Sequence, residues 1–307
     1  MDIVSDVISV VRVGTPGGER VEWRAPWRQD FPDQPGTAGL LVVLHGTCWL
    51  IENAAEPTHL APGDVVFSPH GDGYALADSA ATTAAGNEPA TASPTTVTLC
   101  GGYELSPEWT HPLLRELPGT IHIPARPGHH AGLRAAVEVL GAEVDSRRLG
   151  AAALLPVALD MLLLYVLRVW FEAHPRGETA TGWAAALAAP DISAALNAMH
   201  DDPAHPWTVQ ELADRARLSR ATFSRRFGSL TGQPPLTYLT WWRMTMAARL
   251  LREPSSSLDA VAARVGYTST FAFANAFKRH FRLAPGKYRH QAQARVRPAA
   301  IAPATAE

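Results

Sequence analysis

The chain has 307 residues, of which 47% are hydrophobic and 18% are charged. These values are ordinary for a soluble globular protein, and the length indicates about two domains. Two cysteines, Cys48 and Cys100, are too few for a disulfide framework. The formal net charge is only −2, but residues 205–290 carry 14 Lys and Arg against 4 Asp and Glu, whereas the remainder carries 13 against 25. A basic module joined to an acidic one indicates a polyanionic partner at one end, although a solvated basic face has the same composition.

The first part of the chain is rich in short β-type runs. Its start, MDIVSDVISVVRVG, lacks the basic and apolar regions of a signal peptide, which predicts a cytoplasmic protein. From residue 21 to 105, the runs LLVVLH, TCWLIE, VVFSP and TTVTLC alternate with turn residues, which predicts a small sandwich or barrel. Pro62, Gly63 and Asp64 predict a tight turn between two strands. Residues 79–96 are rich in Ala, Thr, Ser and Pro, and predict a long mobile loop.

The next part is helical in pattern. Residues 128–175 are Ala- and Leu-rich and predict two helices packed together. The run at 151–171 has about the length of a membrane span. Because Pro156, Asp160 and Arg168 interrupt it, we expect a buried or dimerising helix and no membrane. A charge reversal at Arg168 that leaves a dimer intact would argue against a dimer contact there, and an intradomain core helix is the alternative.

A helix pair follows at residues 208–231. Thr208 and Glu211 have capping-box spacing, which marks a helix start. After a short break, Phe223 and Phe227 are expected to point inward on a second helix. At 3.6 residues per turn, the outward positions are then Ala221, Ser224, Arg225 and Gly228, with Arg220, Thr222 and Arg226 on the flanks. This predicts a helix-turn-helix whose second helix enters a major groove.

The same pattern recurs about fifty residues later. Phe273 and Phe277 repeat Phe223 and Phe227 at an offset of 50, so the module is an internal duplicate. Its outward positions are Phe271, Ala272, Ala274, Asn275 and Lys278. The helix between the copies has an inward stripe of Leu239, Trp242, Met246 and Leu250. As a rigid connector it could set the two reading helices one DNA turn apart, roughly 34 Å.

At this point the span 191–290 resembles the AraC/XylS class of bacterial transcription regulators. The resemblance is carried by VAARVGYTSTFAFANAFKRHFRLAPGKYR, with Gly266, Tyr267, Phe273, Phe277, Lys278, Phe281, Pro285, Tyr288 and Arg289 in the expected places. Asn275 stands where the family usually has arginine, and Arg282 replaces a usual glycine. The resemblance implies duplex DNA as a partner, and RNA polymerase as a second one.

We expect the first motif to read bases through Arg225 with help from Ser224. The second is expected to place Phe271 against a thymine methyl, Asn275 against adenine, and Lys278 or Arg279 on phosphate. The full predicted set of DNA-binding residues is Arg220, Thr222, Ser224, Arg225, Arg226, Ser269, Thr270, Phe271, Asn275, Lys278 and Arg279.

The β-rich part resembles a cupin-type barrel of the kind that precedes the DNA-binding half in many AraC-like proteins. Metal-dependent cupins carry a His-x-His pair with a nearby acid, but HGTC at 45–48 has one histidine, so we predict no metal, no cofactor and no catalytic residue. An unorthodox metal site is the alternative, formed by His45, Cys48, His70 and Cys100.

Two kinds of signal are open for this barrel. The predicted ligand pocket for a small organic effector comprises His45, Trp49, Phe67, His70, Tyr74 and Tyr103. The chain also resembles AraC-like regulators that respond to reactive chlorine or electrophiles through cysteine oxidation, which implies Cys48 and Cys100 as sensors. Two small buried thiols with a packing role are the alternative.

The expected fold class is α+β, with a cupin-like β-barrel, a helical connector and an all-α domain with two helix-turn-helix motifs. The predicted boundaries are 1–127 for the sensor, 128–175 for the connector or dimerisation region, 176–190 for a linker, 191–290 for the DNA-binding domain and 291–307 for a disordered tail. The expected function is a sequence-specific transcription regulator and not an enzyme, forming a homodimer through 151–171. The competing interpretations are a cupin enzyme fused to a DNA-binding domain and a basic structural DNA protein.

Overall fold

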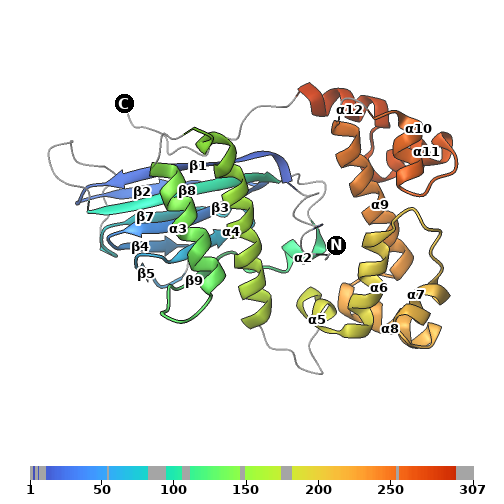
Figure 1. Cartoon of the computed structure of the whole chain (residues 1–307), viewed down its shortest axis with the longest axis horizontal. Coiled ribbons are helices and arrows are strands. Elements are labelled where there is room, and N and C mark those ends of the chain that lie inside the picture. The colour runs from blue at the N-terminus through green and yellow to red at the C-terminus, as the bar shows by residue number, and fades with distance from the viewer. Residues whose placement is uncertain are drawn as a thin grey trace. The chain divides into compact units, whose positions relative to one another are not determined.

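The computed structural model describes residues 3, 6, 12–53, 55–81, 95–105, 111–145, 149–173, 182–253 and 256–294 (Figure 1). These residues form two units that we treat separately. The sandwich unit contains the described residues of Arg12–Pro107 and Leu117–Ala173. The helical unit contains those of Met1–Val11, Glu108–Glu116 and His174–Arg297. The helical unit therefore includes two segments from the first half of the chain.

The sandwich unit is built from two antiparallel sheets, which confirms the α+β class and the predicted sandwich. One sheet has the order β1-β8-β3-β6-β9 and the other β2-β7-β4-β5. The strands are β1 (Arg12–Trp23), β2 (Arg28–Phe31), β3 (Thr37–His45), β4 (Cys48–Glu52), β5 (Thr58–Leu60), β6 (Val65–Ser68), β7 (Tyr74–Ala77), β8 (Thr96–Leu105) and β9 (Ile121–Ile123). The core between them contains Trp23, Trp27, Leu41, Val43, Cys48, Leu50, Leu60, Val66, Leu76 and Cys100.

The predicted turn at Pro62, Gly63 and Asp64 is confirmed. Gly63 has φ +88°, and the amide of Asp64 donates to the carbonyl of Ala61 at 3.0 Å. The Asp64 carboxylate accepts from the amides of Ala61 and Ala125 and contacts His122 at 3.0 Å, which lowers its pKa despite the burial that raises it. Long-range polar contacts therefore fix a turn that the sequence already marks.

Helices α3 (Ala131–Asp145) and α4 (Ala151–Ala173) belong to the sandwich unit and pack on β1, across a face of the five-stranded sheet (Figure 1). Glycine permits the close approach, since a methyl group at Gly101 would lie 3.0 Å from Leu159. α4 is long and apolar enough to cross a membrane by composition, and its residues Leu159, Leu162 and Val166 are fully buried. Leu154 and Val157 at its start are 48% and 62% exposed.

The helical unit contains nine helices among its described residues. They are α2 (Pro112–Arg115), α5 (Trp183–Ala188), α6 (Pro190–Asp201), α7 (Val209–Arg215), α8 (Arg220–Thr231), α9 (Pro235–Arg252), α10 (Leu258–Arg264), α11 (Thr270–Phe281) and α12 (Pro285–Ala294). Trp242 and Leu250 of α9 are buried, as the predicted stripe requires. The α7–α8–α9 set matches α10–α11–α12, so the repeat covers three helices in each copy.

Some predicted irregular segments differ from the structure. Residues 183–188 of the predicted linker form α5, because an Ala-rich stretch favours a helix and Trp183 is buried at 1% exposure. Residues 174–181 lie outside the described residues. Residues 291–294 of the predicted tail form the last turn of α12, and 295–307 lie outside the described residues, as do 82–94 of the predicted loop.

Candidate DNA-binding site

The first motif begins with the predicted capping box, which is confirmed. The Thr208 hydroxyl accepts from the amide of Glu211 at 3.2 Å, and the Glu211 carboxylate accepts from the amide of Thr208 at 2.7 Å. These bonds lower the pKa of Glu211. They satisfy two amide donors that a helix start otherwise leaves open, so α7 begins at a defined residue.

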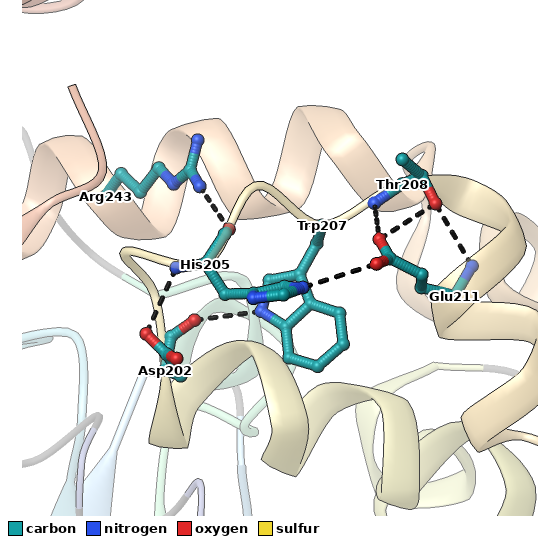
Figure 2. A network of polar contacts seen from close by, with 6 residues as sticks. All are labelled: Asp202, His205, Trp207, Thr208, Glu211 and Arg243. Carbon is teal, nitrogen blue, oxygen red and sulfur yellow. Dashed lines mark hydrogen bonds and ion pairs between the residues drawn. The ribbon is translucent and has the colours of Figure 1, made fainter. Parts of the chain in front are cut away.

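A network of polar contacts in the segment between α6 and α7 sets the position of that helix start (Figure 2). The Arg243 guanidinium of α9 donates to the carbonyl oxygens of Pro203 and His205 at 2.7 Å each. The Trp207 indole donates to the carbonyl of Asp202 at 2.8 Å, and the His205 amide donates to the carboxylate of the same residue at 3.0 Å. No local sequence pattern predicts this network, because its contacts span up to 40 residues.

In α8, Phe223 and Phe227 are fully buried, as predicted. Ser219 caps the helix by accepting from the amide of Thr222 at 3.2 Å. With the phenylalanines inward, Arg225 is exposed and Ser224 is half-buried on the outer side. The outer face of α8 therefore carries the exposed guanidinium of Arg225 beside small side chains.

The two flanking arginines of α8 differ in their surroundings. Arg220 is the first helical residue and is exposed. The Arg226 guanidinium forms an ion pair with Asp191 of α6 at 2.7 Å, although it stays 49% exposed. This ion pair links α8 to α6, and helical spacing alone does not predict it.

The second motif repeats these features. Ser257 and Ser269 cap α10 and α11, and Phe273 and Phe277 are fully buried. On the outer side Phe271 is 77% exposed. The other predicted contacts Asn275, Lys278 and Arg279 are exposed, and the Thr270 hydroxyl donates to Asp259.

Each copy contains one glycine and one arginine in a left-handed backbone conformation. In the turn between the first two helices, Arg217 has φ +55° and its counterpart Gly266 has φ +77°. At the end of the second helix of each motif, Gly232 has φ +74° and its counterpart Arg282 has φ +58°. The two copies therefore share one backbone path, and the departure of Arg282 from the family pattern does not change it.

The two cysteines lie in the same core cluster but on different sheets. Cys48 is on β4 and Cys100 on β8, with exposed fractions of 0% and 4%. Burial raises the pKa of the Cys48 thiol to about 12, and the nearby Cys100 contributes to that shift. Burial raises the pKa of Cys100 to about 11, against a hydrogen bond with Thr98 that lowers it. Both thiols are therefore protonated at neutral pH.

The residues predicted to line one ligand pocket lie on different faces of the sheets. Val66 and Cys100 belong to the core between the sheets, so strand alternation directs Phe67 and Tyr103 to the opposite face of their sheet. Trp49, next to the core residue Cys48, likewise points to the outside of its own sheet.

The other predicted pocket residues have separate surroundings. The His70 ring bonds the carbonyl of Leu117 at 2.9 Å, and His45 is exposed at the end of β3. Tyr74 stacks on Phe31 at 4.8 Å and lines a surface groove of 430 Å³. Among the described residues, no three His, Cys, Asp or Glu side chains cluster in a way that could hold a metal ion.

A cupin sandwich and two helix-turn-helix motifs in the same chain are the architecture of a class of transcription regulators. The protein-family model described as cupin matches residues 2–172, and the model described as helix-turn-helix domain matches residues 212–291. The chain belongs to the AraC-like family of DNA-binding transcription regulators.

Two relatives by sequence agree with this assignment. An AraC-like transcription regulator of Streptomyces lividans is 32% identical over 94% of this chain and 98% of its own length. The RCS-specific HTH-type transcriptional activator RclR of Escherichia coli is 29% identical over 84% of this chain and 88% of its own. The crystal structure of the DNA-binding domain of AdpA with a target DNA matches 34% of this chain and 95% of that domain, at 39% identity and a TM-score of 0.33.

Proposed function

We propose that α8 and α11 read two successive major-groove segments of a duplex operator. The observation that carries this proposal is the repeated placement of buried phenylalanines on one side of each helix and exposed Arg225 or Phe271 on the other. Arginine donates two hydrogen bonds to guanine, and an apolar side chain favours a thymine methyl. In α11, Asn275 is the candidate for an adenine edge.

The remaining predicted contacts position each motif on the sugar-phosphate backbone of the DNA. Arg220, Lys278 and Arg279 are exposed cations at the ends of the reading helices, where phosphates approach. Ser224 assists Arg225 in its contact with the base. We also place Thr222, Ser269 and Thr270 near the DNA phosphates. Ser269 caps α11 and Thr270 is its first residue, and a helix start favours phosphate. Arg226 is kept as a predicted DNA contact, and its half-exposed guanidinium also pairs with Asp191.

The test is binding of the full chain to fragments of its own upstream region. Arg225→Ala should cost about 1–3 kcal/mol and relax the preference at one base pair. Arg134→Ala, an exposed arginine on α3 of the sandwich unit, is the charge-matched control and should leave binding unchanged. A uniform loss across all sequences would make Arg225 a phosphate contact, and no change would refute base reading by α8.

We propose further that the sandwich unit senses a signal, either a small organic ligand or oxidation of Cys48 and Cys100. Oxidation is supported by the shared core cluster and by the RCS-specific relative. The raised pKa of both thiols favours a ligand instead, because the thiolate is the reactive form. DNA binding before and after hypochlorite, in the wild type, Cys48→Ser and Cys100→Ser, separates the two: a response lost in the variants indicates oxidation.

We also infer a cytoplasmic regulator, and not an enzyme, that acts with RNA polymerase as a homodimer. The dimer contact is placed on the exposed start of α4, where Leu154 and Val157 are 48% and 62% exposed. Val157→Asp should convert a dimer to a monomer in sedimentation, whereas Arg134→Asp should not. Arg168, whose guanidinium lies 5.3 Å from the Tyr165 ring, gives the second test by charge reversal.

A further inference from the structure

A short segment from the first half of the chain is built into the helical unit. Residues 111–116 follow β8 and precede β9, both strands of the sandwich unit, yet they belong to the unit that carries the reading helices. His111 and Leu113 in this segment are 0% and 1% exposed, and Leu114 is 6% exposed. Burial of this extent makes the segment part of the helical core.

His111 is held by a ring cage. Its imidazole contacts Trp183 of α5 edge-on at 4.7 Å, and Trp241 and Tyr238 of α9 at 5.0 and 5.9 Å. These rings surround an imidazole that desolvation keeps uncharged, since burial lowers the pKa of His111 well below its usual value.

The hydrogen bonds of the cage form a directed chain. The amide of Leu113 donates to His111 Nδ1 at 2.9 Å, so the neutral ring carries its proton on Nε2 and donates it to the Tyr238 hydroxyl at 3.1 Å. That hydroxyl donates to His200 Nε2 at 2.6 Å, and His200 Nδ1 donates to Asp6 at 3.1 Å. One tautomer of each ring satisfies every bond, which favours a single arrangement of the segment.

The other end of the segment caps a helix. The Glu116 carboxylate accepts from the amide of Trp183 at 2.5 Å at the start of α5, and Gly182 at φ +91° leaves room for it. α5 in turn packs on α8. Leu117, the next residue, belongs to the sandwich unit, where its carbonyl oxygen bonds His70 at 2.9 Å. The peptide bond between Glu116 and Leu117 therefore joins a residue that is hydrogen-bonded within the helical unit to one that is hydrogen-bonded within the sandwich unit.

We propose that residues 111–116 are a coupling segment that sets the position of the first reading helix, α8, and makes DNA binding by the first motif responsive to the sandwich unit. The second motif is the internal comparison, because Tyr288, the counterpart of Tyr238, packs on Phe277 at 5.4 Å and hydrogen-bonds Arg252. The inference rests on the proposed DNA-reading role of α8, and it adds His111, Tyr238 and Glu116 as positioning residues.

The test compares Tyr238→Phe with Tyr288→Phe in the full chain. Both variants remove one hydroxyl from equivalent rings, but only the first breaks the bonds to His111 and His200. We expect amide hydrogen exchange in α5 and α8 to become at least tenfold faster in Tyr238→Phe, while exchange in α11 stays within twofold of the wild type. Glu116→Gln, a substitution at an exposed residue that weakens the α5 cap, should give the same pattern.

Footprinting on a bound upstream fragment gives the functional readout. In both coupling variants, protection should weaken by at least tenfold on the half-site of the first motif and persist on the other half. Unchanged exchange in α8, or equal effects on both motifs, would overturn the coupling role. If the wild type binds no DNA, the reading proposal fails while the exchange measurement still judges the coupling segment.

Discussion

The equivalent ends of α8 and α11 carry different residues, and exchanging residue type at the two ends should change the stability in opposite directions. Gly232 ends α8 at φ +74°, and Arg282 ends α11 at φ +58°. Glycine adopts this left-handed conformation freely, whereas a residue with a Cβ meets its own carbonyl oxygen. Arg282→Gly should therefore stabilise the helical unit, and Gly232→Arg should destabilise it.

The expected size follows from two opposing contributions. A left-handed residue with a Cβ costs about 1–2 kcal/mol, and the added freedom of glycine in the unfolded chain costs about 0.5–1 kcal/mol. A Cβ at Gly232 would meet nothing within 4 Å, and Arg282 is exposed, so backbone strain is the main difference at both sites. The net effect is about 0.5–1 kcal/mol for each change, or roughly 2–8 °C in the unfolding temperature of a domain of about 100 residues.

Thermal unfolding of the full chain, followed by calorimetry, measures both variants. The transition of the helical unit should rise for Arg282→Gly and fall for Gly232→Arg, while the transition of the sandwich unit stays constant. A shift of the same sign for both variants, or a fall for Arg282→Gly, would show that local backbone strain does not control these helix ends.

Three further outcomes follow from buried groups. Gly266→Ala should cost more than about 2 kcal/mol of unfolding free energy in a urea titration, because its Cβ would lie 2.6 Å from the carbonyl oxygen of Ala204 at φ +77°; a neutral result would contradict that packing. Burial lowers the folded-state pKa of His111 below its ordinary 6.5, so its contribution to stability is present above pH 6.5 and lost below it. Unfolding free energy should fall by about 1 kcal/mol from pH 7 to 5.5, and His111→Gln should remove that part of the slope; an unchanged slope would argue for a solvated ring. With thiol pKa values of about 12 and 11, Cys48 and Cys100 should react with a thiol reagent at pH 8 at least about 100-fold more slowly in the native chain than in urea, and fast native labelling would favour oxidation as the signal.

The sequence by itself determined the local features of both motifs. The capping box at Thr208 and Glu211, and the inward phenylalanines of each copy, involve residues three or four positions apart. Helix geometry fixes such contacts as soon as the helix forms, so spacing alone predicts them. The duplicate was predicted for the same reason, since each copy repeats the same local pattern.

Only the tertiary structure decided which distant residues share a site. His111 bonds Tyr238 across 127 positions, and Asp6 bonds His200 across 194, so no local pattern marks either pair. Residue spacing also gave no sign that Arg226 would pair with Asp191. The faces of the predicted pocket residues depend on tertiary structure too: strand alternation directs Phe67 and Tyr103 to the face opposite Cys100, and only strand pairing fixes which face is the core between the sheets.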